Sequence, residues 1–380
     1  MSKLKHILVL DPIAFSGGSK VSTKHVLTQL EDKNVRVSVL TADTKTWRHT
    51  QAYTKALWMP VALEKAEQGL AYFARHLLIA LQLVWFRLYI GRIDTALAAS
   101  GPGVDLGLYI AKLILGYRLV QMIHGPVAKS RTIGRCLLHA DNVFYLESTS
   151  DSLCTALSAA GCHQALSELT HFQTFNNGLP KNTWPTQCQY DNAVVFWAAS
   201  LLKWKGLDTL IEALKHIHSS QHIDTHVCFI RPEQTTLPTS EAPQDVMNVS
   251  WHETPDNLDE IRSQSNIFVS TSVKEPFGLS ILEAMAAGMC VIIPKDGAYW
   301  DSQLTHGVNC LKYQAGDITA LAMSLQSAQS DMRSLKRLGK AASVIAQQYR
   351  AEICFGDICE ALATNAESKT SALTRREVQG

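Results

Sequence analysis

Two carboxylates stand close together in the stretch KEPFGLSILEAMAAG, residues 274–288. Glu275 precedes a Pro-Phe-Gly turn, and Glu283 follows in a run rich in Leu, Ile, Met and Ala that predicts a helix. The first N–H groups of a helix have no partner inside it, so its start can hold an anion. Each carboxylate alone could be an ordinary turn residue or a solvated helix residue. Together, beside an anion site, they suit the hydroxyl groups and phosphates of a sugar nucleotide.

A lysine at a comparable position supports this hypothesis. Lys205 ends a loop after the apolar run NAVVFWAAS, and Gly206 opens a helical pattern. A lysine beside the N–H groups of a helix start can hold a phosphate. A solvated surface lysine is the ordinary alternative. A site is favoured because Lys205 and Glu275 each follow an apolar run in the same half of the chain.

Two further candidates lie in the first half of the chain. Gly17 and Gly18, in FSGGS after the first apolar run, allow a ligand to approach the backbone closely. They do not form G-x-G-x-x-G, so the dinucleotide fingerprint is absent. His124 follows another apolar run and is succeeded by Gly125 and Pro126. It is either a site residue or an ordinary structural or exposed histidine.

Apolar runs that predict buried strands precede all of these residues. They alternate with helical patterns such as GPGVDLGLYIAKLIL and KGLDTLIEALKHI, so we expect parallel sheets with helices on both faces. In such sheets, ligands bind beyond the carboxyl ends of the strands. The expected strands are KHILVLDP, VRVSVLTAD, DTALAAS, RLVQMIHG, DNVFYLES, LTHFQTFNNG, NAVVFWAASLL, THVCFIRP, VMNVSWHE, NIFVSTS and MCVIIPK.

The chain length and a polar interruption predict two domains. A chain of 380 residues is too long for one ordinary core. The alternation stops at polar residues around 185–190 and then restarts, which indicates a hinge. We therefore expect an α/β protein with two doubly wound domains, residues 1–186 and 190–344. The polar tail, residues 366–380, is expected to be frayed.

Composition excludes several classes of protein. Lys plus Arg total 35 and Asp plus Glu 34, which gives no reason to expect nucleic acid as a partner. Nine cysteines occur singly, without C-x-x-C or metal-ligand spacing, as expected for a reduced cytoplasmic protein without structural zinc. The start has about five apolar residues before Asp11, fewer than the roughly 7–15 of a signal peptide, so we expect a first strand there.

One segment does not fit the alternation. Leu70–Tyr89, LAYFARHLLIALQLVWFRLY, is long and apolar, but Arg75, His76, Gln82 and Arg87 interrupt it and argue against a membrane span. A buried helix of the first domain is the favoured interpretation. The alternative is a helix that makes peripheral contact with a membrane surface.

With these residues assembled, the chain resembles the retaining glycosyltransferases of family 4. EPFGLSILEAMAAG resembles the E-x7-E signature of that family, and KGLDTLIEA resembles its K-G-x-x-x-L-[IL]-x-A segment. FSGG, His124 and NNG match in kind and order. The resemblance covers nearly the whole chain and is strongest from about 195 to 290. It implies the GT-B fold, two Rossmann-like domains that face a central cleft, with a last helix at about 345–365 crossing back to the first domain.

The resemblance also implies an activity. The chain would move a sugar from a nucleotide-sugar donor to a glycan or lipid-linked acceptor in surface polysaccharide biosynthesis. It would need no metal or cofactor, and it would work in the cytoplasm, at the inner face of the membrane if the acceptor is lipid-linked. The donor-binding residues would include Ser200 and Gly297.

The same resemblance assigns roles to individual residues. Glu283 would bind the ribose, Glu275 would lie beside the donor sugar, and Lys205 would neutralise the leaving diphosphate. His124 would contact the sugar from the opposite domain, and Gly17 and Gly18 would lie near the diphosphate or acceptor. Backbone N–H groups would meet the sugar or diphosphate at Phe277, Gly278 and Leu279.

The chain departs from the family pattern first by lacking a positively charged residue. The family usually has an Arg where this chain has Ser200. Losing one charged contact to a developing oxyanion costs roughly 2.7–4 kcal/mol. Lys203 or Arg231 could replace it.

A second departure is the stretch DGAYWDS, which stands where the family has a glycine-rich loop. Gly297 remains, but Tyr299 and Trp300 are expected to bring bulk near the donor sugar, which would alter sugar choice or close the pocket.

Two alternatives stay open. The chain could be a degenerate GT-B protein that binds a nucleotide or a partner without turnover, which Ser200 and the bulky loop favour. It could also be another enzyme on the same fold, such as a nucleotide-sugar epimerase, which would turn over donor without acceptor.

Overall fold

The computed structural model describes residues 4–14, 17–31, 33–48, 50–217, 222–232, 235 and 237–364. The predicted frayed tail, residues 366–380, lies outside them. The chain divides into two compact units. The first unit comprises Met1–Ile13, Thr23–Phe175 and Phe355–Gly380, and the second comprises Ala14–Ser22 and Asn176–Cys354. The division after Phe175 precedes the boundary expected near residue 186.

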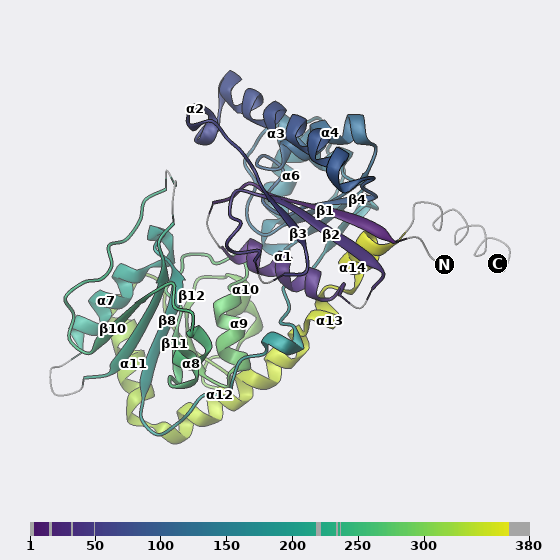
Figure 1. The fold of residues 1–380 in the computed structure, drawn as a ribbon. Helices are drawn as coiled ribbons and strands as arrows, with labels where there is room; N and C mark the ends of the chain where they lie inside the picture. Colours follow the sequence, from purple (N-terminus) through teal and green to yellow (C-terminus); the bar gives the residue numbers. More distant parts are fainter. Residues whose placement is uncertain are drawn as a thin grey trace. The chain divides into compact units, whose positions relative to one another are not determined.

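The first unit contains a seven-stranded parallel sheet with the order β3-β2-β1-β4-β5-β6-β7 (Figure 1). Every residue of the central strand β1 is buried, as expected for a parallel strand that helices cover on both faces. The strands are β1 Lys5–Asp11, β2 Val35–Thr41, β3 Tyr53–Ala56, β4 Thr95–Ala98, β5 Arg118–Ile123, β6 Asn142–Tyr145 and β7 Phe172–Thr174.

Helices join these strands. α14 returns to the first unit near the C-terminus, where Cys359 Sγ lies 3.8 Å from the backbone oxygen of Val26. The helices are α1 Gly18–Thr28, whose first turn groups with the second unit, α2 Val61–Glu64, α3 Gly69–Ile90, α4 Leu106–Leu115, α5 Arg131–His139, α6 Ser150–Ala159 and α14 Gly356–Ala363.

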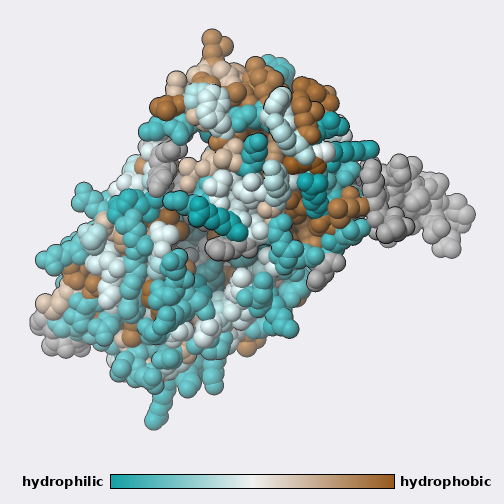
Figure 2. Space-filling view, viewed as in Figure 1, coloured by the Kyte–Doolittle hydropathy of each residue, from teal (hydrophilic) through white to brown (hydrophobic). Residues whose placement is uncertain are grey.

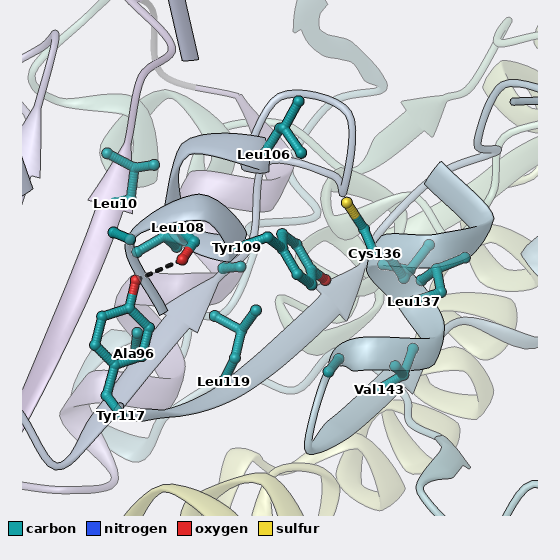
Figure 3. Close-up of a cluster of buried hydrophobic side chains, with 14 of the residues drawn as sticks. Leu10, Ala96, Leu106, Leu108, Tyr109, Tyr117, Leu119, Cys136, Leu137 and Val143 are labelled. Atoms are coloured by element: carbon teal, nitrogen blue, oxygen red, sulfur yellow. Dashed lines mark hydrogen bonds between the residues drawn. The ribbon is translucent and has the colours of Figure 1, made fainter. Parts of the chain in front are cut away.

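The core of the first unit shows how an apolar helix is tied to the sheet. Figure 3 shows Leu108 and Tyr109 of α4 lying among Ala96 of β4 and Leu119 of β5. The Tyr117 hydroxyl donates to the backbone oxygen of Leu108 at 2.6 Å. The Tyr117 hydroxyl therefore has a hydrogen-bond partner inside the core, and the buried side of α4 is held on the sheet.

The second unit contains a six-stranded parallel sheet with the order β10-β9-β8-β11-β12-β13. The strands are β8 Val194–Ser200, β9 Asp224–Ile230, β10 Val249–Glu253, β11 Ile267–Val269, β12 Cys290–Lys295 and β13 Leu311–Gln314. The helices are α7 Leu207–His216, α8 Leu258–Ser263, α9 Leu279–Ala286, α10 Tyr299–Gln303, α11 Ile318–Ser330, α12 Met332–Ala346 and α13 Ala351–Cys354. Short 3-10 turns occupy Glu147–Thr149, Leu166–Glu168, Lys181–Thr183, Lys203–Lys205 and Gln347–Tyr349.

The predicted fold class, α/β with two doubly wound domains, is confirmed. That the two domains face a central cleft stays a prediction. Every expected strand is present, and the two edge strands β3 and β13 were not predicted. Each has only four residues and carries polar side chains, as in YTKA, because an edge strand need not be buried on both faces.

The order in which the chain adds strands reverses at the corresponding place in both sheets. β1 and β4 are neighbours in the first sheet, and β8 and β11 are neighbours in the second. Loops that follow such neighbouring strands meet at one edge, where doubly wound proteins bind ligands. The candidate residues therefore have to be sought at these edges.

Candidate functional site

Lys205 and Glu275 meet at the carboxyl edge of the second sheet. They follow β8 and β11, which are neighbours in space although they are far apart in sequence. Lys205 Nζ lies 2.5 Å from Glu275 Oε2, and the two side chains are only 19% and 15% exposed. Lys205 Nζ also lies 4.0 Å from the centroid of the Trp204 ring. The predicted cation and carboxylate are therefore brought together as a largely buried ion pair.

Thr271 joins the loops that carry these two charges. Its hydroxyl accepts from Trp197 Nε1 at 3.0 Å and donates to the backbone oxygen of Lys205 at 2.9 Å. Gly206 has a φ of +75°, and a Cβ there would lie 2.2 Å from the backbone oxygen of Thr271. Only glycine satisfies both the left-handed backbone and the close approach of the two loops.

The turn after Glu275 ends at Gly278, which caps α9 with a φ of +81°. A Cβ at Gly278 would lie 3.0 Å from Glu275 Cγ. Phe277 as a whole is only 2% exposed, so its ring belongs to the core of the second unit and anchors the turn. The turn therefore offers main-chain N–H groups at the start of α9, next to Glu275.

The bulky residues of the 296–301 loop pack against the Pro-Phe-Gly turn. Trp300 is 2% exposed, its ring centroid lies 5.3 Å from that of Phe277, and its Nε1 donates to the backbone oxygen of Gly278 at 3.3 Å. The Tyr299 hydroxyl lies 2.9 Å from that of Tyr349. That these rings bring bulk near the donor sugar stays a prediction. Burying aromatic surface is favourable, and the Trp300 ring turns inward and supports the Pro-Phe-Gly turn, whereas Tyr299 is half-buried.

Gly297 lies at the tip of that loop with a φ of +75°, and nothing lies within 4 Å of a Cβ added to it. Its N–H donates to Asp301 Oδ2 at 2.8 Å, and Asp301 pairs with Lys312 at 2.7 Å. Burial alone would raise the pKa of Asp301, but these two contacts outweigh it and lower the pKa. Asp296 Oδ2 accepts from the N–H of Lys274 at 2.8 Å, so this loop is tied to the one that carries Glu275.

Glu283 has a partner that the sequence did not suggest. Arg262 of α8 lies with Nη2 at 2.8 Å from Glu283 Oε2 and Nη1 at 2.9 Å from Asp259 Oδ1. The Arg262 side chain is 7% exposed. Asp259 Oδ2 also accepts from the Thr186 hydroxyl at 2.7 Å. Arg262 belongs to no motif in the sequence, and only the tertiary placement of α8 brings it to Glu283.

Ser200 ends β8 and is half-buried. The two residues proposed to replace the missing arginine are both paired with carboxylates. Lys203 Nζ lies 2.9 Å from Asp208 Oδ2, and Arg231 Nε lies 3.2 Å from Glu253 Oε1. Either cation would have to leave its carboxylate to meet a phosphate.

The glycines at the start of α1 lie beside the start of α9. A Cβ at Gly18 would lie 3.9 Å from Leu279 Cδ1, and residues 14–22 group with the second unit. The Ser22 hydroxyl donates to Asn177 Oδ1 at 2.5 Å, which ties α1 to the NNG segment. Gly17 accepts from the N–H of Val21 at 3.1 Å as the helix begins. The N-termini of two helices therefore occur next to each other.

His124 belongs to the first unit, directly after β5. Burial lowers its pKa to about 4, so the imidazole is neutral at pH 7. Its Nε2 is buried and has no hydrogen-bond partner within the part of the chain that the structure describes. The ring packs edge-to-face on Phe175 with centroids 5.4 Å apart. His124 therefore presents a neutral nitrogen that can accept or donate a hydrogen bond.

Across the described residues, no group of three or more His, Cys, Asp or Glu side chains could hold a metal ion. All nine cysteines are free. Metal independence and a reducing compartment stay predictions.

Comparison with known proteins adds to this geometry. Residues 181–344 match the family model of glycosyl transferases group 1. This range contains Lys205, Glu275 and Glu283, and it lies within the second unit. No curated protein sequence matches the chain significantly.

Solved structures match nearly the whole chain. Anabaena HepE, solved in complex with UDP-glucose, is 20% identical over 94% of this chain and 99% of its own, with a TM-score of 0.71. A glycosyltransferase from Rickettsia africae is 14% identical over 95% and 99%, with a TM-score of 0.67. Sucrose-phosphate synthase from Thermosynechococcus elongatus is 14% identical over 99% of both chains, with a TM-score of 0.67. The chain thus has the GT-B fold of these proteins, and its second unit matches the glycosyl transferases group 1.

Proposed function

We propose that this protein is a retaining glycosyltransferase that moves a sugar from a nucleotide-sugar donor to a glycan or lipid-linked acceptor. One observation carries the proposal. The start of α9 lies among two carboxylates, each held by a basic residue, Glu275 by Lys205 and Glu283 by Arg262. The match of residues 181–344 to glycosyl transferases group 1 supports it. Family 4 membership and surface polysaccharide biosynthesis are the further parts of the proposal.

The two carboxylates bind hydroxyl groups of the donor. Arg262 occupies Oε2 of Glu283 and fixes the orientation of the carboxylate, so that Oε1 accepts from the ribose. Glu275 lies beside the sugar ring. Ser200 and Gly297 border the donor, and the backbone N–H groups of the 277–279 turn meet the phosphates.

Lys205 supplies the charge that the reaction needs. Without donor it neutralises Glu275, and with donor it turns to the diphosphate. The bond between the sugar C1 and the phosphate oxygen breaks, and the acceptor oxygen bonds to C1 on the same face. The acceptor proton passes to the leaving phosphate oxygen. Stabilisation of the developing negative charge by Lys205 and the α9 start takes the place of a metal ion.

His124 contributes from the first unit as a neutral group. A pKa of about 4 keeps the imidazole uncharged, so it contacts a sugar hydroxyl by a hydrogen bond and adds no positive charge. Gly17 and Gly18 let the start of α1 approach the diphosphate or acceptor. The reaction takes place in the cytoplasm, without metal or cofactor.

A non-catalytic relative that binds a nucleotide or a partner is the second candidate. One observation favours it: Ser200 replaces a cation, and both Lys203 and Arg231 are already paired with carboxylates. An epimerase is distinguished from both by turnover of donor without acceptor.

Thermal unfolding with saturating UDP, GDP, ADP and CMP tests the donor site. A ligand at about 100 times its Kd adds about 2.7 kcal/mol to the free energy of unfolding. We expect one nucleotide to stabilise the native protein and not Glu283→Ala. UDP is tested first because HepE was solved with UDP-glucose.

Glu212→Ala is the matched control, because Glu212 is an exposed glutamate paired with Lys215 on α7 of the same unit. It should keep the full shift. A shift without release of nucleotide from donor and acceptor mixtures would favour the non-catalytic candidate. No shift with any nucleotide would reject the donor site.

A further inference from the structure

α3 of the first unit has an apolar side that the protein leaves uncovered. One side of this helix joins the core through His76, Ile79, Ala80, Leu83, Phe86 and Ile90. The opposite side repeats large apolar residues at helical spacing, each between 51% and 89% exposed: Leu70, Phe73, Leu77, Leu81, Trp85, Leu88 and Tyr89. Such a continuous exposed stripe is unusual on a soluble monomer and marks a binding surface.

Neighbouring elements extend this stripe. Gln82 holds the backbone of Trp58 on α3 by two hydrogen bonds, of 2.9 and 2.8 Å, and the Trp58 side chain is 64% exposed. α4 packs on α3, and Leu113 and Ile114 near its end are also exposed. Figure 2 shows hydrophobic residues, in brown, gathered over the end of the first unit that carries α2, α3 and α4. We call this surface the α3 face.

The α3 face does not cross a membrane. α3 has 22 residues and is long and apolar enough to span one by length and composition alone. Five of its six buried residues, however, are part of the hydrophobic core of the sheet domain, and removing them from it would expose that core. The helix therefore lies along a surface, with one side on the protein and the other side free.

The charges around the α3 face complement an anionic surface. α3 itself contains Arg75 and Arg87 and no acidic residue. Residues 53–94 hold five basic and three acidic residues, a net charge of +2 that includes the Arg92–Asp94 ion pair at 3.6 Å, whereas the whole chain has +1. The balanced composition of the chain thus conceals a local excess of positive charge. Lys55 Nζ lies 4.8 Å over the Tyr89 ring, at the edge of the apolar stripe.

The residue types favour a lipid interface over a protein partner. Trp58, Trp85 and Tyr89 have an apolar body and a polar edge, which suits the boundary between lipid headgroups and acyl chains. Basic residues beside an apolar helix stripe add attraction to anionic headgroups. We propose that the α3 face is a peripheral docking surface for an anionic lipid bilayer. This inference concerns binding alone and does not rest on the proposed sugar transfer.

Vesicle flotation of the full-length protein tests the proposal. The probes are vesicles of phosphatidylcholine alone and vesicles with about 30% phosphatidylglycerol. We expect the wild type to bind the anionic vesicles about 10-fold or more tightly than the neutral ones, and binding to weaken with added salt. Leu77→Glu/Leu81→Glu should lose about 100-fold in affinity, because it places two charges in the stripe.

Met323→Glu/Val344→Glu is the matched control. These two residues are 64% and 66% exposed on α11 and α12 of the second unit, and their replacement should leave vesicle binding unchanged. Lys65→Gln, which removes one exposed positive charge, should weaken binding to anionic vesicles about fivefold and leave binding to neutral vesicles unaffected. An unfolding midpoint equal to that of the wild type, measured by thermal denaturation without ligand, establishes that each variant is folded.

Two results would overturn the proposal. One is a wild type that binds neither kind of vesicle. The other is equal loss of binding in Leu77→Glu/Leu81→Glu and in the matched control, which would place the lipid contact elsewhere. Light scattering without lipid adds a second reading. A wild-type dimer that ignores vesicles and becomes monomeric in Leu77→Glu/Leu81→Glu would assign the α3 face to a second copy of the chain.

Discussion

The carboxyl edges of the two sheets hold their polar groups in opposite ways. In the second unit the carboxylates of Glu275 and Glu283 are each matched by a basic side chain. In the first unit Asp105 is buried and His124 is half-buried with its Nε2 enclosed; neither has a charged partner among the described residues, and burial raises the pKa of Asp105 to about 7 and lowers that of His124 to about 4. Burial thus favours the neutral forms of Asp105 and His124 at the first edge, whereas the second edge pairs its carboxylates with basic side chains.

This difference arises although both sheets share one topology. Burial disfavours a charged group unless an opposite charge or hydrogen bonds compensate it. The second unit supplies compensation from separate elements, and such an edge suits a charged nucleotide. Around Asp105, the first unit supplies neutral donors, the N–H of Ser100 at 2.9 Å and Gln121 Nε2 at 3.2 Å from Oδ2. A neutral edge suits the uncharged hydroxyl groups of a sugar.

Replacement of Lys205 is expected to have the largest effect at the carboxyl edge of the second sheet. Lys205→Ala should lower kcat by about 100- to 1000-fold, because one charged contact to the leaving group is lost. Initial rates at saturating donor measure this loss. Lys215→Ala, which removes an exposed lysine on α7, should keep the wild-type rate. Equal rates for Lys205→Ala and the wild type would show that the leaving group is stabilised elsewhere.

The next prediction concerns the close contact between the loop that carries Lys205 and the loop that carries Glu275. Gly206→Ala should lower the free energy of unfolding by about 2–3 kcal/mol, because it combines a left-handed φ with a clash against Thr271. Gly316→Ala is the matched control. Gly316 has a similar φ of +78° and nothing within 4 Å of an added Cβ, so about 1 kcal/mol is expected. Urea denaturation of both variants measures the difference, and equal costs would contradict the close approach.

Orientation of Glu283 should matter less than the charge on Lys205. Arg262→Met leaves Glu283 without its cation and should raise KM for the donor about 10- to 100-fold while changing kcat little. Arg262→Lys keeps one charge but cannot bond Asp259 and Glu283 with the same geometry, so it should recover only part of the loss. A fall in kcat with KM unchanged would assign Arg262 a role in the chemical step.

The pH dependence of stability tests whether Asp105, in the first unit, is neutral. The pKa of Asp105 in the folded protein, about 7, lies above that of the unfolded chain, so the folded state holds a proton that the unfolded state releases. Stability from this group therefore falls as pH rises from about 4 to about 7. Asp105→Asn removes this fall, and its stability relative to wild type should gain about 1.4 kcal/mol between pH 6 and pH 8.

Urea denaturation at the two pH values measures that gain. Asp151→Asn, at an exposed aspartate on α6, should show no such change. A gain for Asp105→Asn that is the same at both pH values would contradict a neutral Asp105.

The strands and the main site residues could be predicted because their signals are local. A run such as KHILVLD is buried throughout, and its composition alone indicates a strand inside a sheet. Lys205 and Glu275 each follow such a run, and the carboxyl ends of neighbouring parallel strands meet. Their proximity was therefore implied by the order of the elements.

Contacts between distant elements could not be predicted in this way. Arg262 carries no motif, and the inward turn of Trp300 depends on the space beneath Phe277. The apolar pattern of α3 indicated a buried helix, which holds for one side only. Sequence composition does not state which neighbours will cover a side chain.

The sequence by itself determined which residues stand at strand ends and helix starts, because hydrophobic periodicity and glycine conformations act over a few neighbouring residues. Only the tertiary structure decided which charges neutralise each other and which side of α3 stays uncovered. These depend on packing between residues far apart in the chain. Arg262 and Glu283 belong to different helices, α8 and α9, and their 2.8 Å contact exists only when both helices pack on the sheet that contains the intervening strand β11.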